Sequence, residues 1–203
     1  MEIARLDRAS ARALLGLRAR SVAVMPGSRS HEVRRLLPAM LEAARGREAR
    51  VLLTTALGDD VRRWARREAD RAEIPVFDVD AAEGARRVPA GFDVARCASG
   101  TASLECAMAG VPPVVTYRLD PLGAFVARRA LRTPHVALPN VVLGRRAFPE
   151  LLQDDARADL MRASLEALAS SPSAAADCNE VQRVLGHGHA PARAVAEMIR
   201  RWS

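Results

Sequence analysis

The stretch VARCASGTASLECAM, residues 94–108, decides the fold, because an apolar strand runs directly into a small-residue turn that opens a helix. Such a turn directs free backbone N–H groups and the positive end of the helix dipole at one point, which suits a phosphate. A second stretch, VAVMPGSR at residues 22–29, repeats the design with a strand, a Pro-Gly turn, a hydroxyl and a cation. Two such turns in one domain predict a site for a nucleotide diphosphate.

On either side of these turns, short apolar segments alternate with helix-like segments. Strands are expected where the segments are β-branched and bounded by Gly, Pro or Asp, at 22–25, 51–55, 74–77, 94–98 and 114–117. Helices are expected where apolar residues recur every three or four positions, at 32–45, 59–72 (with Asp59 as N-cap), 102–109 and 122–131. This alternation predicts an α/β, Rossmann-like parallel sheet with helices on both faces.

The pattern changes after Tyr117. A short helix is expected over 121–132, where apolar residues mix with arginines, followed by a proline-punctuated loop that includes Pro139 and Asn140. From Glu150 onward the chain is expected to be helical, with breaks at 170–174 and 186–191.

Length and composition favour one domain with a small appendage. The 203 residues are 49% hydrophobic, and we expect a Rossmann-like domain over 1–170 and a C-terminal helical segment over 171–203. The net charge is +7, but every basic residue is Arg and only 3% of residues are aromatic. This composition disfavours nucleic acid as a partner and favours an anionic ligand or membrane surface.

Targeting and metal-binding signals are weak in this sequence. No apolar run approaches the roughly 20 residues needed to cross a bilayer, and residues 1–20 lack a signal-peptide core. A cytoplasmic location is therefore expected. Cys97, Cys106 and Cys178 lack metal-ligand spacing and are expected to be buried thiols, while His187 and His189 fit a loop. Neither a metal nor another cofactor is predicted.

The residues of the two turns have complementary chemistry. Gly27 lets the backbone approach a ligand, Ser28 offers a hydroxyl, and the planar guanidinium of Arg29 matches phosphate oxygens. Glu105 follows Thr101 by one helical turn, so its carboxylate could accept hydrogen bonds from the two hydroxyls of a ribose. It could equally be an ordinary acid favoured by the helix dipole, and both interpretations stay open.

Four motifs in fixed order carry a family resemblance. They are MPGSRSHEVRRLLPAMLEAA (25–44), FDVARCASGTASLECAMAGVPPVVTYR (92–118), PLGAFVARRAL (121–131) and LPNVVLGRRAFPELLQDD (138–155). Together they resemble the carboxyl half of the lipid A disaccharide synthases, which are inverting glycosyltransferases of the GT-B fold. The similarity extends from about residue 8 to the last helix.

The resemblance implies a function and a set of site residues. The family transfers an acylated glucosamine from UDP-2,3-diacylglucosamine to 2,3-diacylglucosamine 1-phosphate (lipid X) and releases UDP. The carboxyl-terminal domain would bind the donor, without metal, because helix dipoles and arginine neutralise the leaving diphosphate. The UDP-holding residues would be Ser28, Arg29, Ser99, Gly100, Thr101 and Glu105, with Arg118, Asn140 and Gln153 lining the same cleft.

The chain departs from the family pattern in its extent and at Arg96. The family's N-terminal acceptor domain, where the general base is expected, does not precede the motifs here, so no catalytic residue is assigned. A separate N-terminal polypeptide could complete the enzyme, and the helices over 176–203 could pair with a second copy. Arg96 stands where the family has an apolar residue, which predicts a sheet edge exposed by the missing domain.

Other functions remain open beside this one. The chain could be a non-catalytic relic of the same fold that docks on a membrane or partner through residues 121–132, although that helix could equally pack in the core. It could also be another GT-B UDP-sugar enzyme, such as the peptidoglycan glucosaminyltransferase or a UDP-sugar epimerase. The segment PNVVLGRRAFPELLQ (139–153) argues against the last two.

Overall fold

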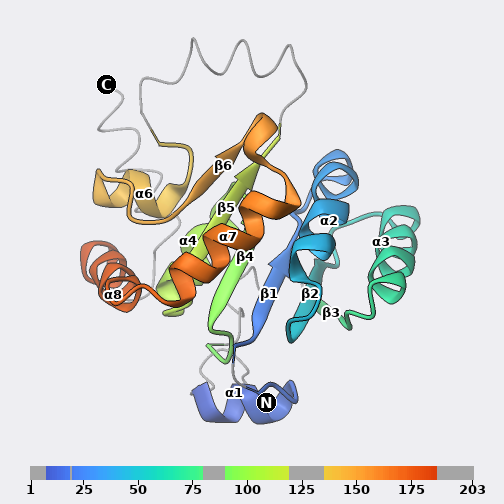
Figure 1. Cartoon of the computed structure of the whole chain (residues 1–203), viewed down its shortest axis with the longest axis horizontal. Helices are drawn as coiled ribbons and strands as arrows, with labels where there is room; N and C mark the ends of the chain where they lie inside the picture. The colour runs from blue at the N-terminus through green and yellow to red at the C-terminus, as the bar shows by residue number, and fades with distance from the viewer. Residues whose placement is uncertain (1–7, 19, 80–89, 119–134, 187–203) are drawn as a thin grey trace.

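A six-stranded parallel sheet forms the centre of the computed structural model, which describes residues 8–18, 20–79, 90–118 and 135–186 (Figure 1). The strand order is β3-β2-β1-β4-β5-β6, and every neighbouring pair is parallel. The strands are β1 Val22–Met25, β2 Ala49–Thr54, β3 Val76–Val79, β4 Val94–Ala98, β5 Pro113–Tyr117 and β6 Glu150–Leu152. This is the order of the doubly wound Rossmann fold, so the predicted fold class is confirmed.

Helices surround the sheet because its central strands are buried on both sides. In Figure 1, α2 and α7 lie in front of the sheet, α4 lies behind it, and α1 lies at the amino ends of the strands. The helices are α1 Arg8–Leu14, α2 Ser30–Ala44, α3 Asp59–Arg71, α4 Thr101–Met108, α6 Leu138–Leu143, α7 Ala158–Ala169 and α8 Ala174–Leu185, with a 3-10 turn, η3, at Gln153–Asp155.

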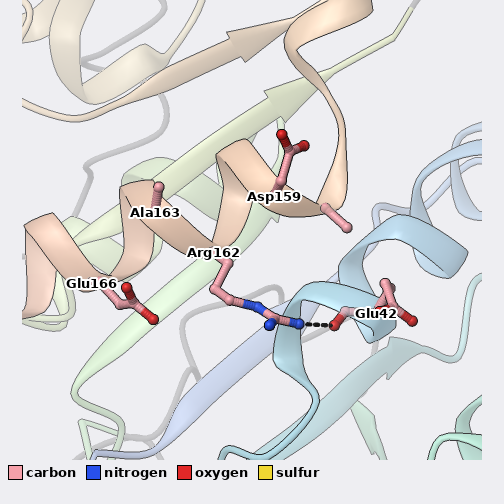
Figure 2. Close-up of a pocket in the computed structure, with 6 residues that line it drawn as sticks. Glu42, Asp159, Arg162, Ala163 and Glu166 are labelled. Carbon is pink, nitrogen blue, oxygen red and sulfur yellow. Dashed lines mark hydrogen bonds between the residues drawn. The ribbon is translucent and has the colours of Figure 1, made fainter.

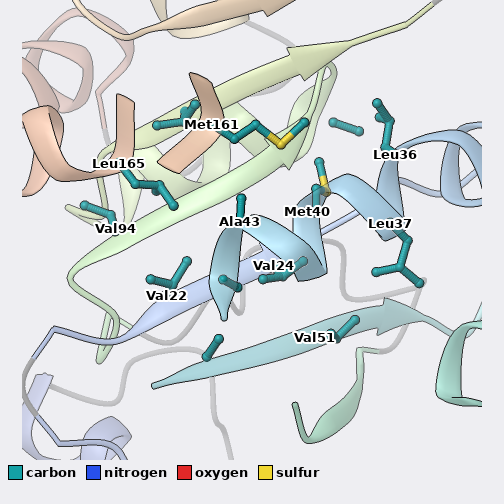
Figure 3. Close-up of a cluster of buried hydrophobic side chains, with 14 of the residues drawn as sticks. Val22, Val24, Leu36, Leu37, Met40, Ala43, Val51, Val94, Met161 and Leu165 are labelled. Carbon is teal, nitrogen blue, oxygen red and sulfur yellow. The ribbon is translucent and has the colours of Figure 1, made fainter. Parts of the chain in front are cut away.

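The main core lies between the sheet and the pair α2 and α7. On α2 the buried apolar side chains follow the helical period, at Val33, Leu36, Leu37, Met40 and Leu41. Figure 3 shows this stripe facing valines of β1, β2 and β4, with two side chains of α7 closing the cluster. The turn at the start of α2 is thus attached to a rigid, well-packed helix.

The three cysteines are buried, as the sequence predicts. Cys97 on β4 and Cys106 on α4 place their sulfur atoms 3.6 Å apart. The contact with Cys97 and burial both raise the pKa of Cys106, and burial raises that of Cys178 to about 12. The thiols of Cys106 and Cys178 are therefore protonated packing groups at neutral pH.

Asp93 attaches α1 to the amino end of the sheet. Its Oδ2 accepts hydrogen bonds from the Ser21 amide at 2.7 Å and the Ser21 hydroxyl at 3.1 Å. Arg8 and Arg12 of α1 form ion pairs with the same carboxylate. Burial opposes ionisation of Asp93, but the bonds from Ser21 and Arg12 outweigh it and hold its pKa below the ordinary value.

Replacing Asp93 with asparagine is expected to lower the free energy of unfolding by about 1–2 kcal/mol, because charge-assisted hydrogen bonds are lost. A depressed pKa stabilises the fold above the unfolded-state pKa and loses that effect as pH falls through the folded-state pKa. The difference between wild type and variant should therefore be full at neutral pH and shrink below about pH 4. Urea unfolding at neutral pH and below about pH 4 measures this difference in the free energy of unfolding, with the exposed Asp70→Asn as control.

The structure corrects several boundaries that the sequence predicts. Glu150–Leu152 is the edge strand β6 rather than the start of a helix, because its backbone pairs with β5. Pro139 and Asn140 lie in α6 rather than in a loop, since proline is tolerated in the first helical turn. Gly58, not Asp59, caps α3, and Asp59 is its first helical residue.

Strand β3 begins two residues later than expected. Glu73 adopts a left-handed backbone conformation with φ 57°, and the Ile74 amide bonds back to the Ala69 carbonyl at 3.0 Å. These residues therefore complete the C-terminal cap of α3 instead of starting the strand. The expected helix at 122–131 and the break at 186–191 lie wholly or largely outside the described residues, as do His187 and His189.

Arg96 is at the centre of the sheet, not at an exposed edge. It lies on β4 between β1 and β5, and its side chain is completely buried on the face covered by α2 and α7. Its Nη1 donates to the Met40 carbonyl of α2, whereas Nε and Nη2 have no hydrogen-bond partner in the described part of the chain. Burial, with the nearby cations Arg47 and Arg162, lowers the pKa of Arg96 to about 9.

Candidate functional site

The PGSR turn connects the end of β1 to the start of α2. Gly27 has φ 108°, and a Cβ atom there would approach the Glu32 Oε2 to 2.8 Å and the Ala98 Cβ to 3.2 Å. Only glycine fits this position without a shift of its neighbours. Arg29 is the N-cap residue of α2, and both Ser28 and Arg29 are exposed. The turn therefore presents a hydroxyl and a guanidinium beside the positive end of a helix of 15 residues.

The SGT turn connects the end of β4 to the start of α4. Gly100 caps α4 with φ 147° and ψ −165°, a conformation that is essentially restricted to glycine. The Ser99 amide continues the sheet ladder by donating to the Thr116 carbonyl of β5 at 2.9 Å. The Thr101 side chain is exposed at the first helical position, and Glu105 lies one turn further along α4.

The two turns meet because β1 and β4 are neighbours in the sheet. Met25 pairs with Cys97 in the parallel register, so both strands end at the same edge. Between β1 and β4 the strand order reverses, and open α/β sheets bind ligands in the crevice at this switch point. The structure thus brings together the two turns that the sequence singles out.

Two further predicted residues follow the next strands along this edge. Arg118 comes directly after β5, and Gln153 comes directly after β6 with a left-handed φ of 53°. Both side chains are partly exposed. Since β4, β5 and β6 are consecutive in the sheet, the predicted residues from four strands line one continuous edge.

Asn140 is completely buried and its side-chain amide is engaged within the protein. Nδ2 donates to the Phe148 carbonyl at 2.8 Å and to Glu150 Oε1 at 2.7 Å. Oδ1 accepts from the amides of Ala147 and Phe148 at 3.0 and 2.8 Å. These bonds use the amide's two donors and both lone pairs, so Asn140 shapes the backbone between α6 and β6.

A hydrogen-bond chain connects Asn140 to the SGT turn. Glu150, which accepts from Asn140, also accepts from the amides of Val136 and Ala137 at 3.0 and 3.2 Å. The Ser99 hydroxyl donates to the Val136 carbonyl at 3.2 Å. Asn140 can therefore influence the turn through Glu150 and the segment before α6.

Glu32 also lies at this turn, although the sequence did not single it out. Its side chain is only 7% exposed, forms an ion pair with Arg29 at 2.8 Å, and packs against the position of Gly27. A glutamate in the first turn of a helix is common because of the helix dipole, so residue type and position gave no warning. The close spacing to Arg29 was the only available signal.

A separate groove lies between the C-terminal half of α2 and α7. Figure 2 shows Glu42, Asp159, Arg162, Ala163 and Glu166 around it, with Arg162 donating to the Glu42 carbonyl at 2.9 Å. Its three carboxylates outnumber its single guanidinium, which disfavours an anion. Glu42 is about 20 Å along α2 from the PGSR turn, so the groove is not part of the switch-point site.

Other kinds of site find no support within the described ranges. Among these residues there is no group of three or more His, Cys, Asp or Glu side chains placed to hold a metal ion. None of the described helices combines the length and the apolar character that a membrane crossing requires. Arg29 and the N-termini of α2 and α4 contribute positive potential at the switch point.

A parallel sheet in Rossmann order, with these turns at its switch point, defines an α/β domain consistent with the C-terminal domain of a GT-B glycosyltransferase. The family profile described as lipid-A-disaccharide synthetase matches residues 2–197. The chain belongs to this family.

Individual relatives agree with the family profile. The lipid-A-disaccharide synthase of Erwinia tasmaniensis is 38% identical over 171 residues, which is 80% of this chain and 44% of the relative. That of Serratia proteamaculans is 40% identical over 78% of this chain and 43% of its own length. That of Anaeromyxobacter dehalogenans is 36% identical over 94% and 52%, respectively. The chain thus spans about half the length of these curated relatives.

Proposed function

We propose that this chain is the donor-binding half of a lipid A disaccharide synthase and binds UDP-2,3-diacylglucosamine. Ser28, Arg29 and the amides at the start of α2 would contact the diphosphate from one side, and Ser99, Gly100 and Thr101 from the other. Glu105 would accept hydrogen bonds from the ribose hydroxyls. Arg118 and Gln153 would line the same edge, with Asn140 acting through Glu150.

The observation that supports this most directly is the juxtaposition of the two turns. Each offers backbone N–H groups at a helix N-terminus, and their strands are paired through Met25 and Cys97. Gly27 and Gly100 keep both turns free of side-chain bulk, which permits close approach of a phosphate. Arg29 supplies a planar donor pair that matches phosphate oxygens.

Titration of the chain with UDP is expected to give saturable heat in calorimetry. Arg29→Ala should weaken the affinity about tenfold or more, because a charge-assisted hydrogen bond is worth roughly 1.5–3 kcal/mol. Arg67→Ala, which removes an exposed arginine of α3, is the control and should leave binding unchanged. Absence of saturable UDP binding by the folded wild-type chain would contradict the proposal.

We further propose that transfer to 2,3-diacylglucosamine 1-phosphate requires the amino-terminal half found in the relatives. Transfer needs donor and acceptor held together in a site from which water is excluded. The isolated chain should therefore bind donor without forming disaccharide, and adding the amino-terminal half of a relative should restore product. Mass spectrometry measures the product. The requirement would be refuted if the chain alone formed disaccharide at a rate comparable to that of the chain with the amino-terminal half added.

The chemistry of this donor places the proposed reaction at a membrane surface. An acylated glucosamine resides in a bilayer, and the net charge of +7 favours approach to anionic lipid headgroups. We accordingly propose a cytoplasmic protein that is peripheral on the inner membrane. The segment 121–132, expected to take part in docking, lies outside the described residues.

A further inference from the structure

We propose that Glu32 is a positioning residue that holds the Arg29 guanidinium at the PGSR turn in the orientation needed for a phosphate. This inference rests on the proposed function, because it assigns Arg29 to the diphosphate. Glu32 itself would not contact the ligand and would act through Arg29.

The ion pair joins a fixed group to an exposed one. Arg29 Nη1 lies 2.8 Å from Glu32 Oε1, and the side chains are 68% and 7% exposed, respectively. An exposed arginine samples many rotamers unless something holds it, and ordering it on ligand binding costs entropy. A buried carboxylate three residues along the same helix can restrict the arginine before the ligand binds, which reduces the entropy lost on binding.

The Glu32 carboxylate is well placed for this role because the backbone around it is constrained. It lies beside Gly27, where a Cβ would contact its Oε2, and Ala98 at the end of β4 borders the same space. Val33 and Leu36 on the same helix are fully packed in the core. The anchor is therefore fixed relative to both turns, and a guanidinium bound to it is fixed as well.

The geometry leaves donors available on Arg29. A guanidinium carries five N–H donors, and the hydrogen bond to Glu32 uses only the Nη1 end of Arg29. The remaining N–H groups can bind phosphate oxygens while the ion pair stays in place. Glu32 has the same sign of charge as the ligand, so its contribution through positioning opposes its direct Coulomb effect.

This opposition gives a decisive test with Glu32→Gln. Direct electrostatics predicts tighter binding when the negative charge is removed, whereas positioning predicts weaker binding. We expect calorimetry with UDP, and with inorganic pyrophosphate as a simpler probe, to show affinity weakened about 3- to 10-fold, the usual size of one such interaction. In an Arg29→Ala background the same substitution should have no further effect, because the group it positions is absent.

A matched control is available on α3. Glu68 pairs with Arg71 at the same three-residue spacing, again with the arginine 71% exposed, so Glu68→Gln should leave binding unchanged. Glu32→Asp keeps the charge but shortens the side chain, so it should also weaken binding. It replaces Glu32→Gln as the test if the glutamine variant does not fold. Unchanged or tighter binding in folded Glu32→Gln, or equal weakening in the Arg29→Ala background, would overturn the inference.

A second measurement decides the matter without a ligand. The Nε–Hε signal of Arg29, assigned by its loss in Arg29→Lys, should show restricted motion in nitrogen-15 relaxation and lose this restriction in Glu32→Gln. Identical relaxation in both chains overturns the inference even if UDP binds. If the wild type binds neither UDP nor pyrophosphate, the proposed function fails, while relaxation still tests whether Glu32 orders Arg29.

Discussion

Asn140→Ala is expected to lower the free energy of unfolding by about 3–5 kcal/mol, because it leaves the buried amide and carbonyl of Phe148 without their side-chain partner. The Phe148 amide loses its acceptor and the Phe148 carbonyl loses its donor, while the Ala147 amide keeps its bond to the Arg145 carbonyl and Glu150 loses one of its donors. Urea unfolding measures the change, and the exposed Asn179→Ala is the control. Loss below about 1 kcal/mol would mean that water or neighbouring groups replace these bonds.

A companion variant separates shape from hydrogen bonding at this position. Asn140→Asp keeps an acceptor for the two amides but turns an acceptor oxygen toward the Phe148 carbonyl and Glu150. It should therefore be destabilising as well, since two buried carboxylates repel each other. If UDP affinity falls in either variant while the chain stays folded, the effect reaches the SGT turn through Glu150 and Val136.

Arg96→Met is expected to raise the free energy of unfolding by about 1–3 kcal/mol, because methionine fills a similar volume without a buried charge. The native arginine is costly because Nε and Nη2 find no hydrogen-bond partner among the residues that the structure describes. Arg96→Ala should be less stable than the methionine variant by about 2–5 kcal/mol, since it leaves a cavity under α2 and α7. The exposed Arg67→Met should change little.

The pH dependence gives this prediction a second readout. The pKa of Arg96 is lowered to about 9, so the folded state binds this proton less tightly than the unfolded state. Stability of the wild type should rise as pH increases through that value, and its deficit relative to Arg96→Met should narrow. Urea unfolding at neutral pH and at about pH 10 measures the difference in the free energy of unfolding between the wild type and Arg96→Met. If Arg96→Ala had the same free energy of unfolding as Arg96→Met, the packing argument would be contradicted.

The sheet was predictable because its central strands carry strong local signals. Residues 22–25 and, apart from Arg96, residues 94–98 are short apolar runs that end in glycine-containing turns, and a parallel strand buried on both faces has this pattern. The juxtaposition of the two turns followed from the rule that parallel strands end at one edge. By contrast, β6 has only three residues, which is too short to show a period of two.

The site was less predictable where a residue's role depends on its partners. Nothing in the local sequence indicates that the amide of Asn140 is used up by a backbone loop, because its partners are seven to ten residues away. Glu32 looks like any acid at the start of a helix until Gly27 and Ala98 are placed around it. The burial of Arg96 is not predictable from the sequence, because an internal charge is costly. Its Nη1 donates to the Met40 carbonyl of α2, a partner that the local sequence does not indicate.

The row of four strand ends sets a length scale for whatever binds there. Neighbouring strands are about 4.8 Å apart, so the ends of β1 and β6 are separated by about 14 Å across three intervals. A ligand that touches all four ends must lie perpendicular to the strands, with successive chemical groups over β1, β4, β5 and β6. The number of strand ends that a ligand contacts therefore depends on its length. A shortened ligand would lose its contacts one strand at a time, beginning with the strand end that it no longer reaches.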